Sequence, residues 1–409
     1  MKRMSVAGLI GLMLMILVGC ANQKQQWHTW RGPADTGASV DMAWSTDGLE
    51  ELWRSNVGKG HSAVVVSGHN CYTQGNVMTV EEGDTVETEY VFCLDNRSGE
   101  TVWRQGHRAT SGRWPGPGAT PTIDGEHLYT LSRNGRVSCF KAASGEIAWE
   151  RDLVADSLAP SNLYACAPVI VENTLLLNIN KGGMGLDKRS GEVLWQSEKG
   201  RSQYNTPALT MVKGRVAAIL GMGRQVAALD VHTGEHLWEI NRSCPIAPPM
   251  CLGDKLFISS GPLAAYQFND DGAEELWSTR KHRGGFTPFV VVDTLAYGFL
   301  TVSSESQPLA CVSLETGEIH WEQELGPYGA LGASDGKLVI TTGDGQLVVA
   351  EATHEGYKEL YRRESAVTMH DNTGKERVFA NYCWTNPTMA GGKIYLKNNY
   401  GDITCYSAD

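Results

Sequence analysis

Short apolar runs and polar turns alternate along almost the whole chain, with the spacing of β-strands. Residues 207–240 show the repeating unit, in which the runs 207–212, 216–220, 225–231 and 235–240 are separated by turns rich in Gly, Asp and Lys. Runs of about 4–8 residues bounded by such turns predict strands, and no window sustains the 3.6-residue period of a helix. The pattern therefore predicts four-stranded antiparallel meanders.

One motif marks the end of each unit: a turn ending in Ser/Thr-Gly-Glu, then an apolar residue and a Trp. A clear copy runs from Ser144-Gly145-Glu146 to Trp149. Such a turn commonly needs one residue at positive φ, which Gly adopts without steric cost. We expect each aromatic residue to lie on the outer strand of a blade and to pack against the neighbouring sheet. The eight aromatic markers, including degenerate copies, are Trp53, Trp103, Trp149, Trp195, Trp238, Trp277, Trp321 and Tyr361.

The spacing of these markers and the two chain ends define the fold. The markers are 39 to 50 residues apart, which is the length of one β-propeller blade. Residues 381–409 supply three strands without an outer one, and residues 50–56 supply an outer strand without inner ones. Joining them closes a ring. We predict an all-β, eight-bladed propeller of four-stranded antiparallel blades over residues 49–409, closed by pairing of the N- and C-terminal segments in one blade.

The N-terminus has the pattern of a lipoprotein signal peptide. Lys2 and Arg3 precede an apolar stretch at residues 6–18, which ends in Leu17-Val18-Gly19-Cys20. This ending resembles the lipobox of bacterial lipoproteins, which implies that residues 1–19 are removed and that Cys20 is lipidated. The alternative is an ordinary signal peptide with an incidental cysteine. Residues 20–48 are then a tether and leader, and the lipid is expected to hold the protein at the outer membrane, on its periplasmic or cell-surface side.

The charge of the chain bears on its partners. The formal net charge is −11, and removal of residues 1–19 takes away two positive charges and leaves −13. An acidic surface repels phosphate backbones, so a nucleic-acid partner is not expected.

The repeat and the leader together resemble a known family. The repeated turn-Trp motif and the segment Trp27-His28-Thr29-Trp30-Arg31-Gly32-Pro33 resemble the PQQ-like β-propeller repeat proteins. Within that family, the chain is similar to secreted propellers related to the lipoprotein subunit of the outer-membrane β-barrel assembly machinery. The resemblance implies an eight-bladed ring with a central channel and a role as a barrel-assembly accessory.

An enzymatic role is the alternative, and the residues favour it less. The family's PQQ-dependent alcohol dehydrogenases are longer and carry vicinal cysteines, a calcium site and a Trp beneath the quinone. This chain has no Cys-Cys pair and no matching Glu/Asn/Asp set. We therefore predict no cofactor, no metal and no catalytic residue, with a PQQ-dependent alcohol or sugar dehydrogenase-like oxidoreductase as the second hypothesis.

The cysteines are predicted to be packed thiols rather than bridges. Cys93, Cys139 and Cys311 each lie six residues before a turn Gly, at a position occupied by Gly or Ala in other units, and Cys405 matches it in the last unit. A buried free Cys fills such a small apolar position. A bridge between Cys71 and Cys93 is the open alternative. The pair His232 and His236 flanks a hairpin turn and is interpreted as solvated rather than metal-binding.

The segments that precede each inner strand carry aromatic residues, most of them with Asn, Arg or Ser beside them. Because equivalent segments of successive blades meet on one face of the ring, we expect these residues to surround the channel mouth. Packing between blades is the alternative role for each of them. The hypothesis is a non-enzymatic, monomeric scaffold that binds a protein partner or a carbohydrate on this face. The predicted face consists of Trp114, Tyr164, Tyr204, Asn205, Phe286, Tyr328 and Trp384.

Overall fold

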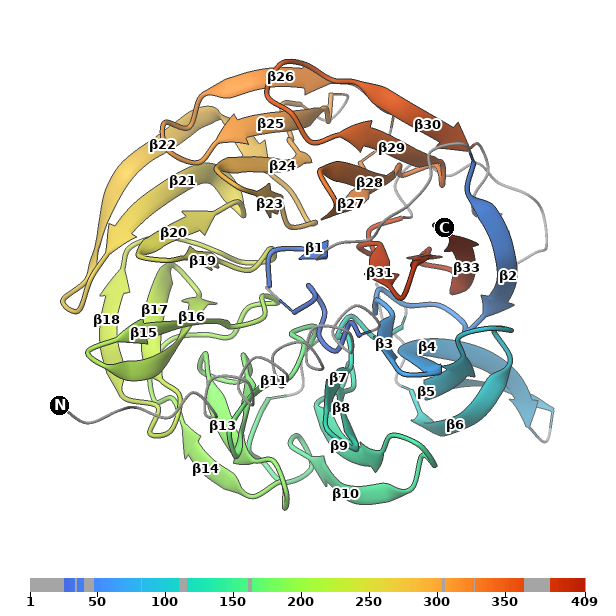
Figure 1. Cartoon of the computed structure of the whole chain (residues 1–409). Helices are drawn as coiled ribbons and strands as arrows, with labels where there is room; N and C mark the ends of the chain where they lie inside the picture. Colours follow the sequence, from blue (N-terminus) through green and yellow to red (C-terminus); the bar gives the residue numbers. More distant parts are fainter. Residues whose placement is uncertain are drawn as a thin grey trace, which may run out of the picture.

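The computed structural model describes residues 26–33, 35–39, 48–81, 83–109, 116–160, 164–303, 306–326, 328–363 and 383–408. Their strands form eight sheets that surround a common axis (Figure 1). The prediction of an all-β, eight-bladed propeller is confirmed. The predicted signal peptide at residues 1–19 and the predicted lipidation site Cys20 lie outside the described residues.

Blades 1 to 4 are antiparallel meanders whose first strand is innermost in the ring (Figure 1). Blade 1 consists of β3 (Val65–Ser67), β4 (Asn70–Glu81), β5 (Asp84–Asp95) and β6 (Thr101–Arg108), and blade 2 consists of β7 (Thr122–Asp124), β8 (His127–Leu131), β9 (Arg136–Lys141) and β10 (Ile147–Asp152). Blade 3 consists of β11 (Val169–Val171), β12 (Thr174–Leu177), β13 (Met184–Asp187) and β14 (Val193–Gln196), and blade 4 consists of β15 (Ala208–Val212), β16 (Arg215–Met222), β17 (Gln225–Asp230) and β18 (His236–Ile240).

Blades 5 to 8 continue in the same direction around the ring. Blade 5 consists of β19 (Met250–Leu252), β20 (Lys255–Ile258), β21 (Gly261–Phe268) and β22 (Ala273–Gly284), and blade 6 consists of β23 (Val290–Val292), β24 (Leu295–Phe299), β25 (Leu309–Ser313) and β26 (Ile319–Gln323). Blade 7 consists of β27 (Ala330–Ser334), β28 (Lys337–Thr341), β29 (Leu347–Glu351) and β30 (Glu359–Arg363), and blade 8 consists of β31 (Thr388–Ala390), β32 (Lys393–Lys397) and β33 (Asp402–Ser407) with β2 (Glu50–Asn56).

The eighth blade contains both ends of the propeller. Strand β2 pairs antiparallel with β33, and Trp53 lies opposite Cys405 (Figure 1). The predicted closure is therefore confirmed. Because the first and last blades share strands, the ring has no open edge between them.

Each marker Trp on an outer strand contacts the next blade around the ring. The Trp149 indole N–H donates to the backbone oxygen of Lys188 at 2.9 Å, and a Cβ on Gly191 would lie 2.6 Å from the Trp149 ring. The turn Gly is thus needed both for its positive φ of 74° and for the space that the ring occupies. The same donation to a turn carbonyl of the next blade is made by Trp53, Trp103, Trp195, Trp277 and Trp321.

Trp238 and Tyr361, the remaining markers, lack this hydrogen bond. The Trp238 indole nitrogen has no hydrogen-bond partner among the described residues, and its ring packs against Phe268 of blade 5. The unit that follows Trp238 and the unit that contains Tyr361 both have turns that depart from the Ser/Thr-Gly-Glu pattern.

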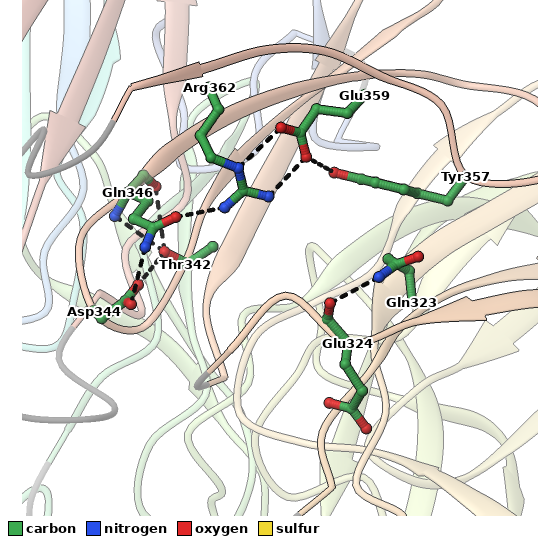
Figure 2. Close-up of polar contacts among 8 residues, drawn as sticks. All are labelled: Gln323, Glu324, Thr342, Asp344, Gln346, Tyr357, Glu359 and Arg362. Carbon is green, nitrogen blue, oxygen red and sulfur yellow. Dashed lines mark hydrogen bonds and ion pairs between the residues drawn. The ribbon is translucent and has the colours of Figure 1, made fainter.

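In blade 7, where Tyr361 replaces Trp, polar contacts hold the outer strand β30 (Figure 2). Arg362 donates from Nε and Nη2 to Glu359, at 2.9 and 2.7 Å, and from Nη1 to Gln346 in the turn before β29. The Tyr357 hydroxyl donates to the same Glu359 carboxylate at 2.7 Å. These partly exposed contacts tie β30 to its own blade, while Arg363 joins the end of β30 to blade 8 by donating to Glu51 at 3.0 Å.

Residues 26–33 and 35–39 of the leader lie inside the ring, which was not predicted from the sequence. Trp27 exchanges two backbone hydrogen bonds of 2.9 Å with Val66 of blade 1, and His28 accepts one from Ile123 of blade 2. Strand β1 (Ala38–Ser39) then pairs in parallel with β27 of blade 7, as a fifth strand of that sheet, in the centre of the ring in Figure 1. The described part of the leader therefore shares backbone hydrogen bonds with blades 1, 2 and 7.

Arg31 anchors the middle of the leader. Its buried guanidinium donates from Nη2 to the backbone oxygen of Phe289 at 3.1 Å and contacts the Met250 sulfur at 2.8 Å. These residues belong to blades 6 and 5. The leader thus spans the channel from blade 1 to blade 7 through contacts on both sides.

The nine cysteines from Cys71 to Cys405 are all free. Cys71 and Cys93 lie on neighbouring strands, but Tyr72 and not Cys71 is opposite Cys93, so the two thiols point to opposite faces of the sheet. Burial raises the pKa of Cys93 and Cys405 to about 12 and that of Cys139 to about 11. These side chains therefore act as small apolar groups.

Candidate functional site

A cavity of about 250 Å³ lies at one end of the channel, and we call it the mouth cavity. The segments that connect one blade to the next supply most of its wall: those leading into blades 1 to 6 and into blade 8 each contribute. A turn of blade 2 and the leader complete it. Its described lining residues are Trp30, His61, Gly116, Gly118, Arg133, Tyr164, Ala165, Tyr204, Ile246, Phe286 and Trp384.

The structure brings together four residues of the predicted face. Tyr164, Tyr204, Phe286 and Trp384 all line the mouth cavity. Tyr204 and Phe286 form its rim, with 42% and 54% of their surfaces exposed. Trp114 lies outside the described residues.

Asn205 and Tyr328 do not line this cavity, and both have partners in the interior. The buried Asn205 amide donates to the Cys244 oxygen at 2.6 Å and accepts from Asn178 and from the Gly221 N–H, both at 3.0 Å. The Tyr328 hydroxyl accepts from the Thr287 N–H at 2.8 Å. Because these contacts satisfy both side chains, we assign both residues to packing between blades, the alternative role that the sequence left open.

Three rings form a stack along one side of the cavity. Trp384 stacks on His61, with ring centroids 5.5 Å apart, and on Phe286, with centroids 5.4 Å apart. Tyr328 supports Phe286 from an edge-on position at 6.2 Å. The stack joins blades 1, 6 and 8, so the exposed Phe286 is held in place although it is at the rim.

A buried cation, Arg133, also belongs to the wall of the cavity. Arg133, in the turn between β8 and β9, is only 3% exposed, and its two terminal nitrogens have no hydrogen-bond partner among the described residues. Its backbone N–H donates to Glu89 Oε1 at 3.3 Å, and its backbone oxygen accepts from Tyr164. The backbone of Arg133 is therefore held beside the cavity, and both terminal nitrogens of its side chain are buried.

The ionisable neighbours of Arg133 favour their neutral forms. Burial, together with the nearby Lys397 and Arg133, lowers the pKa of His61 to about 4, against the opposing effect of a hydrogen bond with Asn399. Burial also raises the pKa of Glu89 to about 8, against the opposing effect of its contacts with Arg133. At neutral pH Arg133 is therefore the charged group of the described cavity wall.

The buried Glu89 predicts a pH-dependent stability. Its pKa is about 8 in the folded protein and near 4.5 when unfolded, so the unfolded state loses its proton first as the pH rises. Stability should fall between about pH 5 and 8, by about 1.4 kcal/mol per pH unit where only the unfolded state is ionised. Glu89→Gln should remove this slope, as measured by urea denaturation at pH 5.5, 6.5 and 7.5.

Glu100→Gln, on an exposed turn, is the matched control and should retain the slope of the unmodified protein. Glu89 is faced by Arg133, Arg136 and Glu87, and Asn76 lies beside Glu87. An unchanged slope in Glu89→Gln would show that these neighbours keep the carboxylate ionised in the folded protein.

Sequence reasoning missed Arg133, His61 and Trp30. Arg133 is in a turn between strands of one blade, not in a segment between blades, and its side chain fits no repeated pattern. His61 does precede an inner strand and carries a ring, so the same search extended to histidine would have included it. Trp30 was visible in the leader motif, but its position in the channel depends on the whole ring.

The site does not fit a calcium–quinone centre. Among the described residues, no group of three or more His, Cys, Asp and Glu side chains is placed to hold a metal ion. Ca²⁺ takes about six to eight oxygen ligands, with carboxylates prominent among them, and no carboxylate is among the described lining residues. The donor set suits an organic ligand or a partner surface better.

Comparison with known proteins identifies the family. A family profile described as outer membrane protein assembly factor BamB matches residues 87–323, which is more than half of the chain. The chain belongs to this family. Proteins named outer membrane protein assembly factor BamB are similar to it in sequence: that of Moranella endobia (strain PCIT) is 27% identical over 190 residues, covering 42% of this chain and 47% of the relative. That of Yersinia pestis is 20% identical over 240 residues, covering 56% and 50%.

The chain thus spans about half the length of the curated BamB relatives it matches. Among solved structures, BamB from Moraxella catarrhalis aligns over 88% of this chain and all of its own, with 15% identity and a TM-score of 0.61. Quinohemoprotein alcohol dehydrogenase from Comamonas testosteroni aligns over 96% and 82%, with 12% identity and a TM-score of 0.69. At these identities the structural likeness shows the fold, which hosts both a BamB and an oxidoreductase.

None of the described residues belongs to a helix long and apolar enough to span a bilayer.

Proposed function

We propose that this protein is a non-enzymatic scaffold, tethered to the outer membrane, which binds a protein partner through the face of the ring that carries the mouth cavity. Membership of the BamB family supports a role in outer membrane protein assembly. The observation that carries the proposal is the convergence of the inter-blade segments on one face, with Tyr204 and Phe286 exposed at its centre. Exposed aromatic side chains are enriched where proteins bind one another.

Lipidation at Cys20 is the proposed means of attachment. A lipid at this position would place the leader, and with it the ring, within a short tether of the membrane. Residues 26–33 and 35–39 are bound inside the ring, beginning with the contacts of Trp27. The short tether would limit how far the binding face can lie from the membrane surface.

Site-specific photo-crosslinking tests the proposed face. A photoreactive amino acid at Tyr204 or at Phe286 should give crosslinks to an envelope protein in intact cells, identified by mass spectrometry. The matched control is Glu126, an exposed residue of the turn between β7 and β8, which lies at the opposite end of the strands. Crosslinks from Glu126 alone, or equal yields from all three positions, would contradict the proposed face.

A further inference from the structure

Each blade has one inner-strand residue whose backbone points into the channel. It is the next-to-last residue of the innermost strand and lies opposite the second residue of the following strand, as Val66 lies opposite Cys71. At this place the N–H and C=O point away from the sheet, as those of alternate residues in an edge strand do. The eight equivalent residues are Val66, Ile123, Ile170, Met211, Cys251, Val291, Ala333 and Met389.

The leader covers four of these places. Its carbonyl oxygens accept hydrogen bonds of 2.9 to 3.3 Å from blades 1, 2, 6 and 7. The covered residues have only 1 to 7% of their surface exposed. In blade 8, Met389 makes no such bond to the described residues but is also buried, at 1%. The four donors to the leader are Val66, Ile123, Val291 and Ala333.

Blades 3, 4 and 5 are not covered by the described part of the leader. Ile170, Met211 and Cys251 have no backbone partner on the channel side among the described residues. None of the three is buried, and Met211 is 57% exposed. A second cavity, of about 390 Å³, is lined by Ile170, Leu209 and Cys251 together with Trp30 of the leader. We call Ile170, Leu209, Met211 and Cys251 the open arc.

We propose that the open arc binds an extended apolar segment of a partner protein, which adds to the inner edge of β15 as a fifth strand of blade 4. An uncovered strand edge is a template for such an addition. The inference goes beyond the proposed scaffold function, because this site is at the inner strands, in the second cavity, and takes an extended segment rather than the surface of a folded partner.

The leader shows the same kind of addition within this protein. Among the described innermost strands, only β15 and β27 have five residues, and the others have three. On β27 the leader adds β1 as a fifth strand, with Ala38 opposite Ala333. On β15, the two residues Leu209 and Met211 both point their backbone groups to the uncovered edge, because they alternate with the residues that bond to β16. The edge of β15 therefore offers two donors and two acceptors to an added strand.

The side chains of the open arc favour an apolar segment that carries a basic residue. Leu209 and Met211 point to the same face of β15 and are 39% and 57% exposed, so an added strand would remove their apolar surface from water. The accessible charges of the described cavity wall are the carboxylates of Asp35 and Asp124, since Arg31 is buried. With a net charge of −11, the chain as a whole also attracts cationic partners.

The probe is an amidated peptide of sequence Lys-Thr-Val-Thr-Val-Thr-Val-Lys with an N-terminal fluorescein. Its binding is measured by fluorescence anisotropy with the full chain in phosphatidylcholine nanodiscs, and nanodiscs without protein are the blank. The peptide should bind, and a version with Glu in place of both Lys should bind more weakly. No binding of the Lys peptide would overturn the proposal, as would binding that appears only after residues 20–25 are deleted, which would assign the open arc to the chain's own N-terminus.

N-methylation distinguishes strand addition from apolar adsorption. One peptide is methylated at the three Val amides and another at the three Thr amides. Because alternate amides of a strand point to opposite edges, and only one edge can face β15, one of the two peptides should bind about 10-fold more weakly or worse, while the other keeps its affinity. Equal affinities of the two methylated peptides would overturn the proposal.

Met211→Pro removes one of the donors on the uncovered edge. The protein should remain folded, because the N–H of residue 211 does not bond to β16 and Pro is tolerated on edge strands. Peptide affinity should fall about 10-fold. Met78→Pro is the matched control: Met78 is 55% exposed and also points its N–H away from its partner strand, but it lies in the hairpin of β4 and β5, outside the open arc. Unchanged affinity in Met211→Pro, or an equal loss in Met78→Pro, would overturn the proposal.

Leu209→Ala tests the apolar contact without altering the backbone. It should weaken peptide binding several-fold, whereas Leu276→Ala, at an exposed residue of the outer strand β22, should not. Equal affinities of these two variants would count against the assigned site. Crosslinking from Tyr204 and Phe286 should be unchanged in Met211→Pro. Peptide binding without partner capture would therefore reject only the scaffold proposal, and the reverse result only this one.

Discussion

Replacing Trp27 with alanine should destabilise the propeller by about 3–5 kcal/mol, the range for truncating a large buried aromatic side chain. Trp27 is 1% exposed, and its ring lies against Gly32, where a Cβ would come within 2.9 Å of it. The same residue carries the two backbone hydrogen bonds to Val66. Loss of the ring leaves a hole next to blade 1 that these backbone contacts cannot fill. Urea denaturation, followed by circular dichroism, measures the change.

Trp30→Ala is the control for the Trp27 prediction. Trp30 is in the same segment and has the same ring, but it is partly exposed and borders open space on two sides. It lines the mouth cavity and also a second cavity of about 390 Å³ beside the inner strands of blades 2 to 4. Its truncation should cost clearly less stability. If both variants lost the same small amount, the leader would be an attachment on the ring rather than part of its core.

The position of the leader inside the ring could not be predicted from the sequence. The blades repeat, so one unit predicts the next, and Trp53 and Cys405 could be assigned to one sheet from their places in the repeat. The leader occurs once. Its contacts with Val66, Phe289 and Ala333 join blades that are distant along the chain. Only the closed ring brings those partners together, so no local pattern predicts them.

The candidate site likewise has a part that could be predicted from the repeat and a part that could not. The aromatic residues before the inner strands could be predicted to gather at one face because each recurs at an equivalent place. Their side-chain directions could not, since neighbours in an extended segment point to opposite sides. Tyr204 therefore faces the cavity while Asn205 turns inward to Cys244 and Gly221. Arg133 follows no repeat at all, and only its burial without a partner identifies it.

The turn Gly of the motif is needed for a second physical reason, which the motif alone does not reveal. Positive φ explains why a turn prefers Gly, but several turns of this protein have a positive-φ Gly with open space around it. Gly214, between β15 and β16, has φ +70° and no atom within 4 Å of a Cβ position. Gly191 has φ +74° and the Trp149 ring of the preceding blade at 2.6 Å. The turn Gly and the preceding Trp are therefore one interlocking unit, and each copy joins two blades.

Gly191→Ala should accordingly cost about 3 kcal/mol, of which about 1 kcal/mol is backbone strain at positive φ. The remainder comes from displacing the Trp149 ring, which would also lose its hydrogen bond to Lys188. Gly214→Ala has the same φ without the ring and should cost only the strain. Trp149→Ala should relieve the clash. The stability cost of Gly191→Ala in that background should therefore fall to about 1 kcal/mol, which is a coupling of about 2 kcal/mol in a double-mutant cycle. Equal costs of Gly191→Ala in both backgrounds would mean that the ring moves aside freely and that the blades are joined by their sheets alone.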